Sequence, residues 1–157
     1  MSSTPSVPAV RAWAKLVRVH QLLLAAVERD LKTAGQPPLA WYDVLLELTR
    51  APEGRLRPFE LERRMLLAQY NLSRLLDRLE RNGLVAREPC REDGRGQWVV
   101  LMAAGRERQR AMWPIYANSI QNHVGAKLAD ADADLLTELL DRVTPEDPAS
   151  TPEGELA

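Results

Sequence analysis

Apolar residues recur at intervals of three and four along most of the chain, which is the spacing of one face of an α-helix. Near the N-terminus this face continues for about three heptads, through Val10, Trp13, Val17, His20, Leu24, Val27 and Leu31. Gly35 and the pair Pro37-Pro38 follow it and are typical of a helix end. We therefore predict a long first helix whose apolar face packs against another helix.

Five further helical segments are predicted, over residues 39–50, 58–65, 69–82, 103–128 and 130–143. The 69–82 segment has one face of leucines, Leu72, Leu75, Leu76 and Leu79. It ends at Asn82-Gly83, where glycine can adopt the left-handed conformation that a helix end often needs. Pro114 removes a backbone donor inside the 103–128 segment, so we predict a kink near Arg110–Trp113.

Two β-prone runs lie between the 69–82 and 103–128 segments. LVAREPC (84–90) and QWVVLM (97–102) flank the charged, glycine-containing tip REDGRG, a pattern that indicates a β-hairpin. Helix, short turn, helix and hairpin are the order of a winged helix-turn-helix. The expected fold class is therefore mainly α (α+β winged helix-turn-helix), with about six helices, a two-stranded hairpin wing and long terminal helices that form a dimerisation region.

The same patterns divide the chain into regions. Residues 1–8 are rich in serine and proline and are expected to be flexible, and the proline-rich, acidic residues 145–157 are expected to be disordered. Residues 9–35 and 104–144 are expected to form the dimerisation helices. Residues 36–103 are expected to form the winged helix-turn-helix.

Composition indicates an ordinary folded domain. The chain has 157 residues, of which 45% are hydrophobic and 27% charged, and a chain of this length can bury a sizeable core. No apolar run reaches the ~18–20 residues that a membrane span requires. The N-terminus has neither the basic region nor the apolar stretch of a secretion signal, so we expect a cytoplasmic protein without a membrane partner.

Charge is distributed unevenly, although the net charge is only −1. Residues 50–110 contain 14 arginines against 9 acidic residues, a net +5, whereas residues 111–157 contain 2 basic and 9 acidic residues, a net −7. A basic middle favours a polyanionic partner, and double-stranded DNA is the partner that we expect. Solvated helix faces can produce the same pattern.

The polar face of the 69–82 segment contains residue types that read DNA bases. Glutamine and asparagine pair with adenine, and arginine pairs with guanine, in the major groove. An arginine-bearing hairpin can enter the minor groove. The candidate DNA-binding residues are Gln69, Tyr70, Asn71, Ser73, Arg74, Arg78, Arg81, Arg91 and Arg95. The alternative is a solvated helix face on which Asp77 and Arg81 form an ion pair.

Residues 73–105 resemble the MarR (multiple antibiotic resistance regulator) family of bacterial transcription factors. The resemblance is carried by Leu79-Glu80, Gly83-Leu84-Val85, Arg87, Asp93-Gly94-Arg95, and Leu101 with Gly105. The chain departs from the family pattern at Ala68 and Met102, where Ser or Thr is typical, and in the wing, where Asp-Gly-Arg replaces Asp-Arg-Arg.

This resemblance implies a homodimer that binds a palindromic DNA site with one winged helix on each half. It also implies that Asp93 steadies the wing and that a small aromatic or phenolic molecule releases the DNA. A pocket for that molecule is expected near Trp13, His20, Trp41 and Tyr42. A core histidine beside aromatic residues that merely pack is the alternative. Cys90 is either a buried thiol or an oxidation-sensitive residue at the base of the wing.

Features of catalysis are absent from the sequence. We find no nucleophile with a partner base, no phosphate-binding glycine loop, and no metal-ligand spacing among His20, His123 and Cys90, so we expect neither an enzyme nor a cofactor. The sequence therefore predicts a homodimeric, sequence-specific DNA-binding transcriptional regulator, a repressor relieved by a small ligand. The alternative is a winged-helix module that binds proteins and not DNA.

Overall fold

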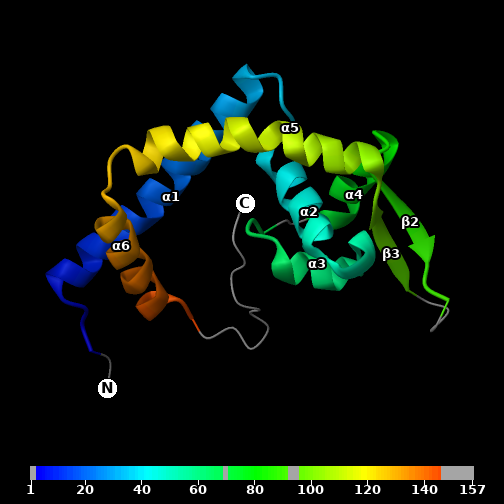
Figure 1. Cartoon of the computed structure of the whole chain (residues 1–157). Helices are drawn as coiled ribbons and strands as arrows, with labels where there is room; N and C mark the ends of the chain where they lie inside the picture. The colour runs from blue at the N-terminus through cyan, green and yellow to red at the C-terminus, as the bar shows by residue number, and fades with distance from the viewer. Residues whose placement is uncertain (1–2, 69–70, 92–95, 146–157) are drawn as a thin grey trace.

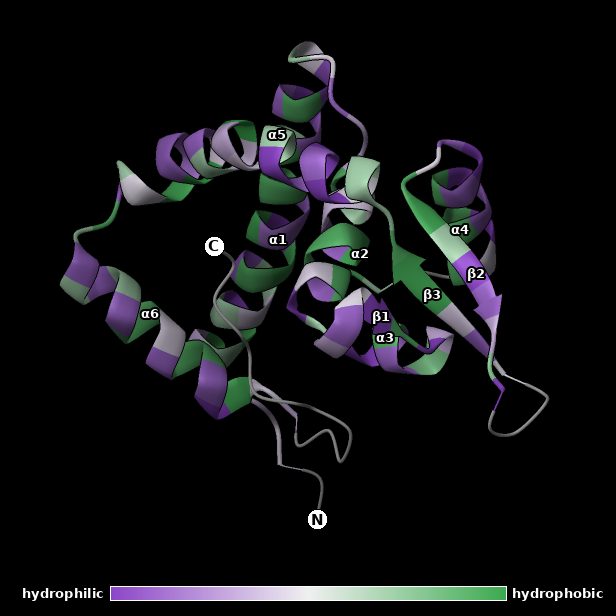
Figure 2. Ribbon diagram, turned by 45° about the vertical axis from the view of Figure 1, so that its right-hand side comes forward, coloured by the Kyte–Doolittle hydropathy of each residue, from purple (hydrophilic) through white to green (hydrophobic). Residues whose placement is uncertain are grey.

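The computed structural model describes residues 3–68, 71–91 and 96–145. These residues form six α-helices and one three-stranded antiparallel sheet (Figure 1). One part of the molecule consists of the long helices α1 (Val7–Thr33) and α5 (Ala103–Ile120) with α6 (Asp130–Val143). The other part consists of α2 to α4 and the sheet, and α6 lies at the end of the molecule away from the sheet (Figures 1 and 2). The expected winged helix-turn-helix fold is confirmed.

Glycine and serine set the ends of α1. The Ser6 side chain accepts a hydrogen bond from the backbone nitrogen of Ala9 at 3.2 Å, which caps the first turn. Gly35 follows the last turn with φ of 71°, a conformation that a residue with a side chain rarely adopts. The predicted end of the first helix before residue 35 is therefore correct.

The winged helix-turn-helix is built from α2 (Leu39–Arg50), α3 (Pro58–Arg64) and α4 (Leu72–Arg81). Its sheet has the order β1-β3-β2, with β1 (Arg55–Leu56), β2 (Val85–Pro89) and β3 (Gln97–Leu101). The two-stranded hairpin of β2 and β3 agrees with the prediction, and β1 adds a third strand that the sequence did not predict. A strand of two residues, β1, is too short to show an alternating pattern, and only its pairing with β3 reveals it.

Two apolar clusters meet on α2. The first joins α2, α3, α4 and the sheet through Val44, Leu45, Leu48, Leu56, Leu61, Leu75, Leu76, Leu79 and Val99. The second joins α1, α2 and α5 through Val27, Leu31, Leu39, Tyr42, Leu46, Met112 and Tyr116. Because α2 is buried on both sides, it connects the long helices to the helix-turn-helix.

α1 begins at Val7, within residues 1–8 that were expected to be flexible. The largest differences from the predicted helix boundaries are at the start of α4 and the end of α5. Regular α-helix begins at Leu72 and not at residue 69, because Asn71 takes the N-cap position. The single helix predicted over residues 103–128 is also wrong at its end. α5 continues through Pro114 to Ile120, and a π-helical turn over Gln121–Gly125 then leads toward α6.

Within the part of the chain that the structure describes, no helix is both long enough and apolar enough to cross a membrane.

Candidate nucleic-acid interface

The helix α4 presents its polar side to solvent because its other side is fixed in the core. Leu72, Leu75, Leu76 and Leu79 are all buried in the first cluster. The opposite face exposes Ser73, Arg74, Arg78 and Arg81. These four predicted DNA-binding residues are therefore brought together on one accessible helix face.

Asn71 has a structural role at the start of this helix. Its Oδ1 accepts a hydrogen bond from the backbone nitrogen of Arg74 at 3.0 Å, so the side chain caps the first turn of α4. A two-point contact with adenine would need the same oxygen. Base reading by Asn71 would therefore compete with its role as N-cap.

Arg87 joins the wing to α4. Its guanidinium lies 2.8 Å from the Asp77 carboxylate and donates to the Ser73 carbonyl at 3.0 Å. The Arg87 backbone nitrogen also donates to the Glu80 carboxylate at 2.9 Å. These contacts fix β2 against the polar edge of α4, so Arg87 positions the two elements relative to one another.

The alternative interpretation of this helix face supposed an ion pair between Asp77 and Arg81, and the structure has other partners for both residues. Asp77 pairs with Arg87, while the Arg81 Nε donates to the backbone carbonyl of Asp77 at 3.3 Å. Sequence spacing along a helix favours the pair four residues apart. The register of β2 beside α4 decides otherwise, and the sequence contains no local signal of that register.

Arginine side chains stack on Trp98 on the outer face of the sheet. The Arg55 guanidinium lies 4.5 Å and the Arg57 guanidinium 5.2 Å from the centre of the Trp98 ring, within the range of cation–π contacts. Arg91 is exposed nearby and lines the same shallow depression as Arg55 and Trp98. The base of the wing therefore has several arginines, although Glu88 lines the same depression and Glu53 pairs with Arg55 at 2.8 Å.

Cys90 is packed inside this part of the wing. Its side chain is only 2% exposed, and its sulfur accepts a hydrogen bond from the Arg57 guanidinium at 3.3 Å. Of the two interpretations of Cys90, a buried thiol or an oxidation-sensitive residue, the geometry favours the buried thiol.

A buried acid fixes the turn between α3 and α4. The Asp43 carboxylate accepts hydrogen bonds from the backbone nitrogens of Leu66 at 3.0 Å and Leu67 at 2.8 Å. Burial raises the pKa of Asp43 above its ordinary value, and the two backbone hydrogen bonds oppose that rise. Asp43 was not predicted as a functional residue, although an acid between apolar neighbours in LAWYDVLLEL is a usable signal.

Several predicted site residues lie outside the described residues. They are Gln69, Tyr70, Asp93 and Arg95.

The four residues expected near an effector pocket do not form one site within a single chain. Tyr42 is buried and packs against Tyr116, with ring centres 5.1 Å apart, whereas Trp41 packs against the other cluster. Trp13 and His20 are exposed on α1. Leu24 of α1 packs against the cluster that contains Tyr42. Trp13 lies about 16 Å before Leu24 along the helix axis. His20 is also not a core histidine in the single chain, because it is exposed.

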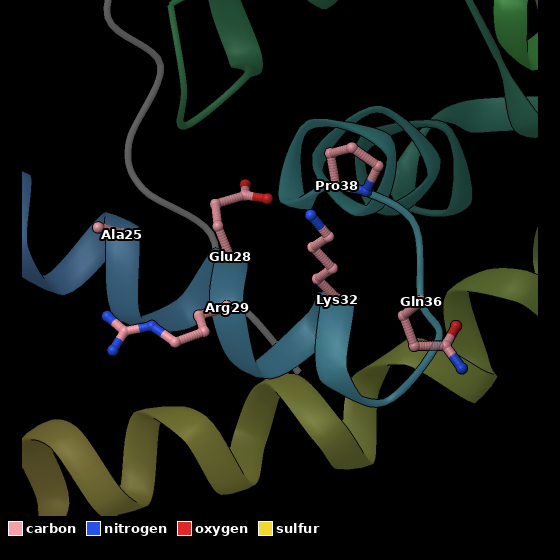
Figure 3. A pocket seen from close by; sticks show the side chains of 6 residues that line it. All are labelled: Ala25, Glu28, Arg29, Lys32, Gln36 and Pro38. Carbon is pink, nitrogen blue, oxygen red and sulfur yellow. The ribbon is translucent and has the colours of Figure 1, made fainter.

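A different cavity lies where α1 meets the start of α2. It has a volume of about 610 Å³ and is lined by Ala25, Glu28, Arg29, Lys32, Gln36 and Pro38 (Figure 3). Glu28 accepts a hydrogen bond from the backbone nitrogen of Leu39 at 3.0 Å, which ties α1 to α2. The cavity is open and mixed in charge, and none of the four predicted pocket residues lines it.

One serine, aspartate and histidine lie together, but not in the order that activates a nucleophile. Asp30 is the central residue and accepts hydrogen bonds from Ser119 at 2.6 Å and from His123 at 2.9 Å. In a catalytic triad the histidine stands between the other two. These contacts instead join α1 to α5 and to the π-helical turn, and they lower the pKa of Asp30, mainly through the Ser119 hydrogen bond.

Comparisons with known proteins agree with this geometry. The family model described as MarR family matches residues 36–96. The uncharacterized HTH-type transcriptional regulator YkoM of Bacillus subtilis is 33% identical over 89 residues, and the match spans 57% of this chain and 56% of YkoM, so it covers little more than half of that relative.

Solved structures match over nearly the whole chain. The MarR family transcriptional regulator Sco3205 of Streptomyces coelicolor, solved in complex with DNA, superposes with a TM-score of 0.85 and 26% identity over 98% of this chain and 97% of Sco3205. AbsC, a MarR family transcriptional regulator of the same organism, has a TM-score of 0.79 and 28% identity over 90% of this chain and 95% of AbsC. Together with the exposed face of α4 and the three-stranded wing, these likenesses show a winged helix-turn-helix similar to those of MarR family transcriptional regulators.

Proposed function

We propose that this protein is a sequence-specific DNA-binding regulator that represses transcription as a homodimer. The observation that carries the proposal is the outward face of α4, where Ser73, Arg74, Arg78 and Arg81 are exposed opposite four buried leucines. A helix fixed in this way fits the major groove with its N-terminal residues at the base edges. We assign Gln69, Tyr70, Asn71 and Arg74 to base reading, and Arg78 and Arg81 to phosphates.

The charge pattern of α4 favours an anionic partner. Arg74 and Arg78 are one turn apart on the exposed face, and a like-charge pair at this spacing destabilises a helix by a few tenths of a kcal/mol unless an anion lies opposite. Arg91 extends the basic surface toward the wing, where Arg95 is assigned to the minor groove and Asp93 to the support of the tip. A phosphate backbone would neutralise all of these cations at once.

The proposed dimer interface uses exposed apolar faces at the other end of the molecule. Val10, Trp13 and Val17 on α1 are 50%, 69% and 38% exposed, and Leu139 and Val143 on α6 are 45% and 65% exposed. Monomeric proteins rarely expose apolar residues that follow one another along two helices. A second copy that covers these faces through two-fold symmetry would place two α4 helices on the halves of a palindromic site.

A small aromatic or phenolic effector is part of the proposal. The cavity between α1 and α2 lies where the dimerisation helices meet the helix-turn-helix, and Arg29 and Lys32 in its lining could pair with an acidic group. Tyr42 and Trp41 lie on the adjoining helix α2. Trp13 and His20 are exposed on α1, so they would join such a site only through the partner subunit. A ligand that separates α1 from α2 would change the distance between the two α4 helices.

A salt titration of DNA affinity tests the proposal. We expect the protein to bind the duplex immediately upstream of its own reading frame in a fluorescence anisotropy assay. A dimer that neutralises about 6–10 phosphates should lose about 10³–10⁵ in affinity between 50 and 200 mM salt. Replacement of Arg78 by alanine should reduce the steepness of this dependence, whereas replacement of Arg110, which is exposed on α5, should not.

Two other outcomes would contradict parts of the proposal. Failure to bind any duplex in dilute buffer would favour the alternative, a winged-helix module that binds proteins. Binding that is unaffected by a series of small aromatic acids and phenols would exclude relief by an effector of this class.

A further inference from the structure

Asp43 stands out among the charged residues of the described chain because it is buried. Its side chain belongs to α2 and is only 5% exposed, and no other charged side chain in the described ranges is as deeply covered. Both of its oxygens are engaged: Oδ1 accepts from the Leu66 backbone nitrogen and Oδ2 from the Leu67 backbone nitrogen. One carboxylate therefore holds two consecutive amides of the turn that precedes α4.

Apolar contacts hold the same turn less specifically. Met65 packs against the first cluster and Leu67 against the second, so the turn lies between the two cores. Packing of this kind fixes where the turn lies but tolerates small rotations, because it is not directional. Two hydrogen bonds to a charged acceptor are directional and about twice as strong as neutral ones. They define the orientation of the backbone just before the helix that faces DNA.

We infer that Asp43 is a positioning residue for DNA binding, whose carboxylate sets the orientation of the α3–α4 turn and thereby the approach of α4 to the major groove. This inference rests on the proposed function. It assigns no contact between Asp43 and DNA. Its effect on affinity is transmitted through the backbone of Leu66 and Leu67.

The surroundings of Asp43 explain why its charge state can change. On α2, Glu47 lies one turn further on and repels it, and the pKa of Glu47 is itself raised by burial. Arg50 of α2 and Arg64 of α3 act on Glu47 and favour its charged form. From α5, Tyr116 faces Asp43, and the Asp43 charge contributes to the raised pKa of that phenol. Among the described residues, the two backbone amides stabilise the Asp43 charge and no cation does so.

Protonation of Asp43 should weaken DNA binding. It should not lower the contribution of Asp43 to the free energy of unfolding. A hydrogen on one oxygen leaves a poorer acceptor for one of the two amides. Because the pKa of Asp43 is higher in the folded chain than in the unfolded chain, the folded chain binds the proton more readily. This group's contribution to stability therefore increases as pH falls from the folded pKa toward the unfolded one. If DNA affinity is lost over that pH interval, the loss therefore comes from the positioning role of Asp43 and not from acid unfolding through this group.

The test combines nuclear magnetic resonance with DNA binding by the full-length protein. The amide proton shifts of Leu66 and Leu67 should titrate together with pH, at a midpoint above the ordinary aspartate value, and the affinity for the operator duplex should fall over the same interval. D43N should abolish both titrations, because it cannot ionise and presents an N–H to one of the two donors. Its affinity at neutral pH should be lower by about tenfold or more.

Glu47 provides the matched control. It is the neighbouring half-buried acid on α2 and has a salt bridge of 3.7 Å to Arg50. E47Q should keep the joint titration of the Leu66 and Leu67 amides and bind DNA within about twofold of the unmodified protein.

The outcomes separate this inference from the proposed function. If the unmodified protein binds the duplex and D43N binds it with the same affinity and pH profile, the inference is wrong and the proposed function stands. If no duplex is bound at any salt concentration, the proposed function is wrong. The amide titration needs no variant, so separate or absent titration of Leu66 and Leu67 would overturn the inference even if D43N failed to fold.

Discussion

At the scale of single residues, exposure separates arginines that can contact DNA from arginines that hold the protein together. Arg74 is exposed on α4, whereas Arg87 is engaged with Asp77, Ser73 and Glu80. Both occur in a basic stretch of the sequence and look equivalent there. The difference arises because β2 lies beside α4, which brings acids of the helix to one arginine and leaves the other to solvent.

Arg74→Ala should relax base preference at one position of each half-site. Arginine contributes discrimination of about 1–3 kcal/mol where it pairs with guanine, and its position near the start of α4 suits such a contact. Affinity should be measured on a set of duplexes with single base-pair changes. Unchanged discrimination at every position would remove Arg74 from the base-reading residues.

Arg95→Ala should weaken binding by a similar factor on all of these duplexes. A wing arginine in the minor groove acts mainly through the phosphates and the groove potential, so its loss should also reduce the salt slope by about 1. The comparison is with Arg74→Ala on the same duplex set. A change in the preference for one base, with the salt slope unchanged, would contradict the assignment of Arg95.

At the scale of elements, the junction between the wing and α5 depends on close backbone packing. A Cβ atom on Gly105 would collide with the backbone carbonyl of Leu84, a group that cannot move aside as a flexible side chain can. The Met102 backbone nitrogen donates to that same carbonyl at 3.0 Å, which joins β3 to the end of the helix-turn-helix. This glycine therefore permits α5 to begin directly against the turn after α4.

Gly105→Ala should lower the free energy of unfolding by about 1–3 kcal/mol, as overpacking of a close contact does. Urea unfolding followed by circular dichroism provides the measurement. Gly125→Ala is the control, because an added Cβ there meets only the end of the Gln121 side chain, which can rotate away. Equal losses in the two variants would show that the contact with Leu84 is not the reason.

At the scale of the whole molecule, the two apolar clusters leave one end of the chain incomplete. The helix-turn-helix has a continuous core, whereas no residue of α6 is buried in the single chain. Leu135, Leu136, Leu139 and Val143 are all more than a third exposed. The second copy that we propose would complete the core at this end.

Leu139→Glu should convert the protein to monomers and remove most of its affinity for a palindromic duplex. Burial of an unpaired charge in an apolar interface is strongly unfavourable, and a monomer offers only one α4 to the site. Sedimentation velocity measures the first effect and anisotropy the second. Glu138→Gln, at the adjacent exposed position on α6, should leave both unchanged, and a Leu139→Glu dimer would argue against this interface.

The sequence by itself determined the elements and their order. Helices α2 and α6 have the bounds that apolar spacing and proline predicted, and the strands β2 and β3 lie within the two predicted runs, 84–90 and 97–102. These features are local: the period of a pattern indicates which face of a segment is buried, and Gly35 or Gly83 marks where a helix must stop.

Only the tertiary structure decided which residues become partners. Asp43 meets amides more than twenty residues away, β1 exists only through its pairing with β3, and Arg87 finds its acids on α4. The residues expected to line one effector pocket are divided between two cores and the surface. The physical reason is that hydrogen bonds and ion pairs require specific distances and directions, and these are set by how elements pack and not by the order of residues along the chain.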